Sequence, residues 1–301
     1  MTGFGARLLA AMTARGQLCV GIDPHVSLLA DWGLSADAAG AREFGLRVVE
    51  AAAGRAAVVK PQVAFFERYG AAGFGALEDV MAAARAAGLI VLADAKRGDI
   101  GTTMDAYAAA WLTPGAPLEA DAVTVSPYLG VGALHSTFEL AGESGKGVFV
   151  LAATSNPEGV FVQRAAPQSG VYENDVVRTN PTVAADVIDE VSTWNRSSDG
   201  PLADVGFVIG ATVDAEGYGL PALIEPLAPI LAPGFGAQGA RLADLGALFG
   251  AQAPHVLASA SRSILRTGPS GLEQAIDAHN RELHQNSDTH QSSETQEGRR
   301  A

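Results

Sequence analysis

Acidic and basic side chains alternate over a few residues where one hydrophobic run ends. The stretch "LADAKRGDIGTT" (92–103) carries Asp94, Lys96 and Asp99 directly after an apolar segment. Two other apolar runs, "AAVVK" (56–60) and "LCVGID" (18–23), end in Lys60 and Asp23. Opposite charges at close range lower the pKa of an aspartate and raise that of a lysine. The pattern therefore predicts a lysine that is held as an ammonium ion and is able to donate a proton.

For any single pair of Asp and Lys, a structural salt bridge or a pair of solvated charges is the alternative interpretation. Lys60 favours a functional site over a structural salt bridge, because it lies at the end of a neighbouring predicted strand. Buried ion pairs give little net stability, so stability alone is a poor explanation for such a cluster. Ionisable groups gathered in a cleft are typical of functional sites. We therefore predict catalytic roles for Lys60, Asp94, Lys96 and Asp99.

A glycine-rich stretch late in the chain, "APGFGAQG" (232–239), has the spacing G-x-G-x-x-G. A dinucleotide site is a poor interpretation, because the stretch lies late and no acidic residue follows about 20 positions on to hold a ribose. A turn in which the backbone N–H groups of Gly234 and Gly236 bind a phosphate fits better. Arg262, in "ASASRSIL", is the predicted side-chain partner of that phosphate. An ordinary flexible turn and a surface arginine remain the alternative.

The elements that position these residues follow a regular alternation. Eight short runs rich in Val, Ile and Leu are each followed by small or polar residues and then by an Ala-rich, helix-like segment. Continuous apolar runs indicate parallel strands that are buried on both faces. We predict a single-domain (β/α)8 TIM barrel over residues 1–283, with a doubly wound sheet as the alternative. The predicted strands are 18–23, 56–60, 89–94, 122–126, 147–153, 205–210, 229–234 and 255–260, and the clearest predicted helices are 36–52, 73–88, 103–112 and 183–195.

Two segments depart from this alternation. The fifth connection, from Thr154 to about Ala203, is much longer than the others, and we expect it to form a partial lid. The stretch 284–301 has no aliphatic or aromatic anchor, so we expect a disordered polar tail.

Composition excludes several functional classes. With 20 basic and 33 acidic residues the formal charge is −13, which repels nucleic acids and anionic membranes. Cys19 is the single cysteine, so there is no intrachain disulfide, and a reducing cytoplasm fits. The apolar run at residues 8–12 is too short for a signal peptide, and no run approaches a membrane span. The six histidines form no metal-binding pair, so a metal site is not expected.

The combined motifs resemble those of the orotidine 5′-phosphate decarboxylase family, in particular its longer bacterial branch. The resemblance rests on the Asp-x-Lys-x-x-Asp pattern of residues 94–99, on "GIDP" and "VVKPQVAFFE", on "APGFGAQG" and on Arg262. It covers roughly residues 15–270. It implies decarboxylation of orotidine 5′-monophosphate to UMP and CO2 in pyrimidine biosynthesis, without a metal or an organic cofactor.

The resemblance also implies roles for individual residues at the reacting end of the substrate. Asp23 and Lys60 would contact the ribose hydroxyls, and Asp94 would lie beside the departing carboxylate. Lys96 would protonate the carbanion left at C6. Such a localised anion has no π-system to delocalise it, so a preorganised cation is the expected means of stabilisation.

Further roles concern the rest of the nucleotide and a second subunit. Asp99 and Thr103 would reach into the neighbouring subunit's site, which implies a homodimer. Ser155 would hydrogen-bond the pyrimidine, Gln238 would bridge base and phosphate, and Arg262 would grip the phosphate. Many relatives have glycine before this arginine, whereas this chain has serine. No role is transferred to residues 157–204.

Three alternatives remain. A magnesium-dependent sugar-phosphate decarboxylase or aldolase of the same barrel group shares the Asp-x-Lys-x-x-Asp motif, but Lys60 stands where its acidic metal ligand is expected. A Schiff-base aldolase needs a neutral lysine, which the carboxylates around Lys96 disfavour. A barrel that binds a phosphate ligand without catalysis is not expected to need Lys60, Asp94, Lys96 and Asp99 together.

Overall fold

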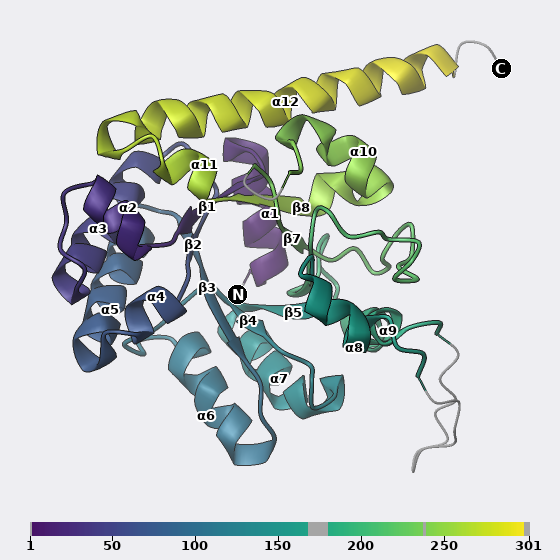
Figure 1. The fold of residues 1–301 in the computed structure, drawn as a ribbon. Helices are drawn as coiled ribbons and strands as arrows, with labels where there is room; N and C mark the ends of the chain where they lie inside the picture. Colours follow the sequence, from purple (N-terminus) through teal and green to yellow (C-terminus); the bar gives the residue numbers. More distant parts are fainter. Residues whose placement is uncertain (1, 168–179, 237–238, 298–301) are drawn as a thin grey trace.

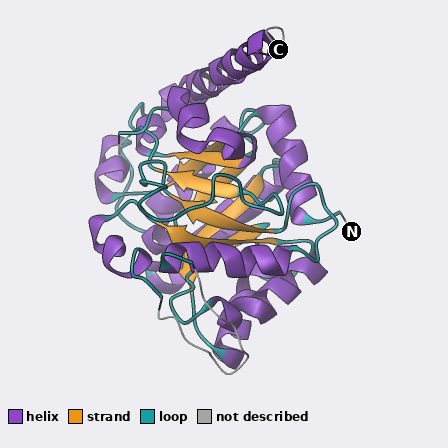
Figure 2. Ribbon diagram, turned by 90° about the vertical axis from the view of Figure 1, so that its right-hand side faces the viewer, coloured by secondary structure: helices purple, strands orange, loops and turns teal. Residues whose placement is uncertain are grey.

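Eight parallel strands close into a barrel in the computed structural model, which describes residues 2–167, 180–236 and 239–297. Each strand pairs with its sequence neighbours, and the first pairs with the last. Figure 2 shows the strands at the centre and the helices around them. All eight predicted strands are confirmed. They are β1 (Leu18–Ile22), β2 (Val58–Pro61), β3 (Ile90–Arg97), β4 (Ala122–Val125), β5 (Gly147–Ala153), β6 (Val205–Ile209), β7 (Ile230–Pro233) and β8 (Val256–Ala260).

Helices fill most of the connections and cover the outside of the barrel (Figure 1). The four clearest predicted helices correspond to α3, α5, α6 and α9, with ends that differ by three residues or fewer. The α-helices are α1 (Phe4–Arg15), α2 (Val26–Asp31), α3 (Ala38–Ala52), α4 (Ala64–Glu67), α5 (Gly70–Ala86), α6 (Gly101–Leu112), α7 (His135–Ser144), α8 (Val160–Gln163), α9 (Val183–Asn195), α10 (Leu245–Phe249), α11 (Arg262–Leu265) and α12 (Leu272–Glu297).

The connection between β6 and β7 and the C-terminal segment both differ from the prediction. The segment 210–229, between β6 and β7, contains turns and no helix, because three prolines and three glycines interrupt it. Helix α12 continues through residues 284–297, where the polar composition predicted disorder. Once the first turns of a helix are formed, each further residue adds a hydrogen bond at little cost, so polar residues extend it. The division of the chain into a barrel and a tail at residue 283 stays a prediction.

The core has two parts on the two sides of the barrel wall. Side chains between the wall and the surrounding helices form the larger cluster, which includes Phe44, Met81 and Phe207. Side chains inside the barrel, such as Leu92 and Phe149, form a smaller cluster together with the apolar face of α1. The continuous burial of the strands follows from this arrangement, since both faces of the wall are covered.

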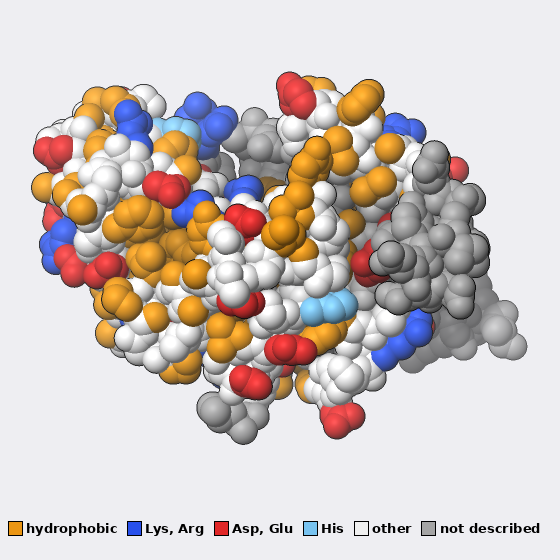
Figure 3. All heavy atoms as spheres, turned by 90° about the horizontal axis from the view of Figure 1, so that it is seen from below, with side chains coloured by type: hydrophobic (Ala, Val, Ile, Leu, Met, Phe, Trp, Pro, Cys, Tyr) orange, Lys and Arg blue, Asp and Glu red, His pale blue; other side chains and the backbone are white. Residues whose placement is uncertain are grey.

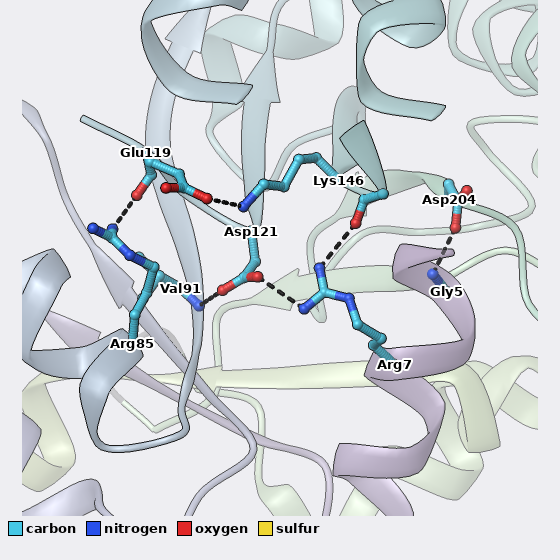
Figure 4. Close-up of polar contacts among 9 residues, drawn as sticks. Gly5, Arg7, Arg85, Val91, Glu119, Asp121, Lys146 and Asp204 are labelled. Atoms are coloured by element: carbon cyan, nitrogen blue, oxygen red, sulfur yellow. Dashed lines mark hydrogen bonds and ion pairs between the residues drawn. The ribbon is translucent and has the colours of Figure 1, made fainter. Parts of the chain in front are cut away.

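Helix α1 covers the N-terminal end of the barrel through polar contacts as well as apolar ones (Figure 4). Arg7 donates from one guanidinium nitrogen to Asp121 Oδ1 and from the other to the carbonyl oxygen of Gly145, both at 2.9 Å. Asp121 Oδ2 accepts from the backbone N–H of Val91 at 3.0 Å, and Asp204 accepts from the N–H of Gly5 at 2.7 Å. The first helix is thereby joined to the strand ends opposite the predicted site.

Candidate active site

Lys60 on β2 and Asp94 on β3 form a buried ion pair at the C-terminal ends of neighbouring strands. Lys60 Nζ lies 2.9 Å from Asp94 Oδ2, and less than a tenth of either side chain is exposed. Burial alone raises the pKa of Asp94, but Lys60 and Lys96 outweigh it and hold the pKa well below its usual range. Burial lowers the pKa of Lys60, and Asp94 and Asp23 outweigh it in turn, so this pKa is raised. Both groups of the pair are therefore charged at neutral pH.

Lys96 reaches the same carboxylate from a different direction, and its ammonium group contacts Asp94 Oδ1. Its side chain is 45% exposed, in contrast to that of Lys60. One end of the Asp94 carboxylate is thus held by a buried cation, and the other by a cation that remains open to a ligand.

A bulge in β3 lies between Asp94 and Lys96 and contributes to this geometry. Ala93 pairs with Val123, but the next pair joins Arg97 to Val125. Three residues of β3 therefore lie opposite one residue of β4. Lys96 takes a left-handed backbone conformation with φ of 48°, which non-glycine residues rarely adopt. The bulge re-aims the Lys96 side chain, as bulges beside active sites do.

Two further side chains complete the environment of Asp94, and the sequence analysis missed both. Gln62 Nε2 donates to Asp94 Oδ2 at 2.9 Å, and the Thr124 hydroxyl donates to Oδ1 at 3.0 Å. The same hydroxyl accepts from the backbone N–H of Lys96 at 2.9 Å. Thr124 was visible as a polar residue within an otherwise apolar strand, whereas no pattern distinguished Gln62.

Asp23 lies at the end of β1 and faces the β8 side of the site. Its Oδ2 accepts from the hydroxyl of Ser261 at 2.5 Å, and its Oδ1 is buried without a hydrogen-bond partner among the described residues. Ser261 fits there because Gly21 has no side chain: a Cβ on Gly21 would lie 2.7 Å from that of Ser261. This oxygen therefore has an unused hydrogen-bond acceptor position.

The glycine-rich turn follows β7 and packs beside the start of α11, whose first residue is Arg262. Gly234 and Gly236 have φ of 118° and 77°, a region that favours glycine. At Gly236 an added Cβ would lie 3.0 Å from the hydroxyl of Ser263 in α11. The predicted phosphate residues Gly234, Gly236 and Arg262 therefore belong to adjacent segments. Gln238 lies outside the described residues.

The remaining predicted residues are placed at the rim. Asp99 follows the bulge, and its Oδ1 accepts from the backbone N–H of Ile100 at 2.8 Å. In the described part of the chain, no hydrogen bond or ion pair joins Asp99 to Lys60 or Lys96. Thr103 is exposed on α6, and Ser155 is exposed just beyond β5. Thus Lys60, Asp94 and Lys96 come together within one chain, whereas no hydrogen bond or ion pair among the described residues joins Asp99 or Thr103 to them.

Comparison with known proteins decides the family. Residues 16–273 match the Orotidine 5'-phosphate decarboxylase / HUMPS family. The chain belongs to this family. It is 54% identical over 269 residues to the orotidine 5′-phosphate decarboxylase of Salinispora arenicola, covering 89% of this chain and 92% of that one. The Streptomyces coelicolor enzyme of the same name is 52% identical over 270 residues, covering 89% and 92%.

Solved structures agree with this membership in the orotidine 5′-phosphate decarboxylase family. A crystal structure from Streptomyces avermitilis matches with a TM-score of 0.87 and 49% identity, covering 95% of this chain and 96% of that one. The orotidine 5′-monophosphate decarboxylase of Leishmania donovani matches with a TM-score of 0.71 and 28% identity, covering 94% and 98%. The (β/α)8 barrel and the resemblance stated from the sequence motifs are both confirmed.

Proposed function

We infer that this chain decarboxylates orotidine 5′-monophosphate to UMP and CO2, and we propose that Lys96 is the proton donor. One observation carries the proposal: the Lys96 ammonium contacts Asp94 at the C-terminal end of the barrel, and the Lys96 side chain is still 45% exposed. In this reaction the bond between C6 and the carboxylate carbon breaks, and its electron pair stays on C6. A proton passes from Lys96 Nζ to C6, CO2 leaves, and solvent reprotonates the lysine.

The charges around C6 support this assignment. A carboxylate with a strongly lowered pKa stays ionised beside the substrate carboxylate, and its negative charge lies in contact with the Lys96 side chain. Stabilisation of a developing anion by a preorganised cation is a large catalytic effect. Lys60 occupies Asp94 Oδ2 at 2.9 Å, which opposes the binding of a divalent cation there and supports a reaction without metal.

The remainder of the nucleotide is assigned to the other predicted residues. Asp23 and Lys60 bind the ribose hydroxyls, and the unpartnered Oδ1 of Asp23 supports this role. Ser155 binds the base, Gln238 bridges base and phosphate, and Arg262 binds the phosphate with the N–H groups of Gly234 and Gly236. Phosphate contacts far from C6 supply binding energy that is expressed in the transition state.

A homodimer with shared sites accounts for Asp99 and Thr103, which we assign to the partner subunit's site. Large apolar side chains are exposed next to Asp99 in the chain and after β4: Ile100, Tyr128 and Leu129 are each more than half exposed. Figure 3 shows the side of the molecule on which α6 lies, where hydrophobic side chains gather in patches between charged ones. Such patches are typical of interfaces between proteins.

The cytoplasm is the proposed location. Cys19 is a buried free thiol, in agreement with a reducing compartment. Within the described residues, no helix has both the length and the apolar character needed to cross a membrane.

In the same residues, no three His, Cys, Asp or Glu side chains are grouped as metal ligands.

The test is the ultraviolet absorbance change after orotidine 5′-monophosphate is added to purified protein that has been treated with EDTA. We expect rapid conversion to UMP, because no step of the proposed reaction uses a metal. Activity that EDTA abolishes and Mg²⁺ restores would contradict the mechanism and favour a metal-dependent sugar-phosphate enzyme. Tight binding of UMP by folded protein without turnover would favour a binding barrel.

A further inference from the structure

The bulge in β3 leaves the backbone N–H of Lys96 without the carbonyl partner that a regular ladder would supply. Residues 94, 95 and 96 lie opposite Thr124 alone, because the pairs on either side are Ala93 with Val123 and Arg97 with Val125. The backbone of Lys96 is left-handed, with φ of 48°. A non-glycine residue keeps such a conformation only where surrounding contacts enforce it. The contact that enforces it here must come from outside the backbone ladder.

The Thr124 hydroxyl is placed to supply that contact. Thr124 Oγ1 accepts from the Lys96 N–H at 2.9 Å and donates its own proton to Asp94 Oδ1 at 3.0 Å. The side chain is fully buried on β4, so water does not compete for the hydroxyl. One acceptor position and the one proton of the hydroxyl are both used, which fixes its orientation.

We propose that Thr124 is a positioning residue for the decarboxylation, which holds the Lys96 backbone and the Asp94 carboxylate in the arrangement that presents the Lys96 ammonium to C6. Thr124 acts through these two residues and transfers no proton to the substrate. The inference rests on the proposed role of Lys96. It adds that the position of the proton donor is set from a neighbouring strand by a single hydroxyl group.

A positioning role for Thr124 predicts that loss of its hydroxyl lowers kcat but leaves the affinity for the nucleotide unchanged. Removal of the hydroxyl leaves the Lys96 N–H and one acceptor position of Asp94 without partners, and the Lys96 backbone is free to relax. Asp23 and the residues assigned to the phosphate follow β1, β7 and β8, and among the described residues no hydrogen bond joins them to Thr124. Lys60 on β2, the other residue assigned to the ribose, contacts Asp94 Oδ2, whereas Thr124 contacts Oδ1. A misplacement of about 1 Å at a catalytic group costs up to about a hundredfold in rate.

The test compares Thr124→Val, which keeps the shape and removes the hydroxyl, with Thr124→Ser, which keeps the hydroxyl. We expect Thr124→Val to lower kcat by about 10- to 100-fold, with KM and the Kd for UMP within about threefold of wild type. Thr124→Ser should restore kcat to within about threefold of wild type. Wild-type kcat in Thr124→Val, equal losses in both variants, or a parallel loss of UMP affinity would overturn the proposal.

Thr137 in α7 provides a matched control. It is also fully buried, but its hydroxyl has no hydrogen-bond partner among the described residues. Thr137→Val should leave kcat unchanged, and a loss as large as that of Thr124→Val would count against a specific role. If Thr124→Val does not fold, Thr124→Ser is compared with Thr124→Ala, and equal kcat values overturn the proposal. Because Lys96→Ala tests the proton donor separately, failure of the positioning role is distinguishable from failure of the mechanism.

Discussion

Asp94 accepts hydrogen bonds from four side chains, two on each carboxylate oxygen. Lys60 and Gln62 donate to Oδ2, and Lys96 and Thr124 donate to Oδ1. An ionised carboxylate has about four acceptor positions, so its capacity is filled. Asp94 is therefore suited to fixing its neighbours and carrying negative charge, and not to taking up a proton as a general base.

Lys96→Ala should lower kcat by at least about a thousandfold, because it removes both the proton and the cation that stabilises C6. The Kd for UMP should stay within about threefold, since the product no longer carries the carboxylate that leaves. Single-turnover kinetics and calorimetry measure the two quantities. Substantial remaining turnover would show that another group donates the proton.

Arg262→Ala should act on binding instead. Loss of a charge-assisted hydrogen bond to phosphate is expected to weaken UMP binding by about 10- to 100-fold. Decarboxylation of orotidine, which has no phosphate, serves as the control, and its rate should be unchanged by the substitution. Equal losses of activity on orotidine and on orotidine 5′-monophosphate would contradict a role for Arg262 in phosphate binding.

The buried pair of Lys60 and Asp94 predicts a pH dependence of stability. The pKa of Asp94 is lowered in the folded chain, so its contribution is present above its unfolded pKa of about 4 and is lost as pH falls further. Lys60→Met removes a partner of this buried charge and should lower the free energy of unfolding by about 3 kcal/mol at pH 7. Urea unfolding at pH 7 and pH 3.5 should show a smaller difference from wild type at the lower pH. A constant difference would contradict the assignment.

At the residue scale, the charged residues of the site could be predicted from the sequence, but the polar side chains that hydrogen-bond to them could not. Lys60, Asp94 and Lys96 are recognisable because charges are unusual at the ends of apolar runs. Gln62 and Thr124 act through cross-strand pairing, which depends on the register between strands and on the bulge. The register cannot be predicted from the residue types and spacing of Gln62 and Thr124.

Among the elements, the strands were the most predictable. Burial on both faces of the barrel wall requires continuous apolar runs, and these are visible in the sequence. The bulge in β3 was not predicted, because it is a property of two paired strands. The short helix α8 in the fifth connection was also missed, and the lid role of that connection stays a prediction, with residues 168–179 outside the described chain.

Helix α1 gives a prediction about stability that is independent of catalysis. Arg7→Ala removes two contacts of 2.9 Å and leaves the nearly buried carboxylate of Asp121 without its cation. The free energy of unfolding should fall by about 2 kcal/mol while kcat is unchanged. Arg42→Ala is the control, because its ion pair with Asp79 is exposed and should contribute about 0.5 kcal/mol or less. Denaturant unfolding of both variants measures the difference.

At the scale of the whole molecule, the shared site predicts complementation between inactive subunits. In a mixture of Lys96→Ala and Asp99→Ala chains, a hybrid dimer has one site with both native residues. Random exchange should restore about a quarter of wild-type activity, because half of the dimers are hybrids and half of their sites are intact. Lys96→Ala mixed with Lys60→Ala is the control and should stay inactive, since both lysines serve the same chain's site. No recovery after confirmed exchange would exclude a site shared in this way.

The contacts of α1 also determine when the molecule is able to finish folding. Gly5 and Arg7 bind residues that lie 199, 114 and 138 positions further along the chain. At about 5–20 residues per second, a ribosome needs on the order of 10 to 40 seconds to make the last of these partners. Phe4, Leu8 and Met12 have no barrel interior to enter during that interval. Helix α1 thus reaches its native position only after much of the barrel has been synthesised, and its apolar face stays exposed during that interval.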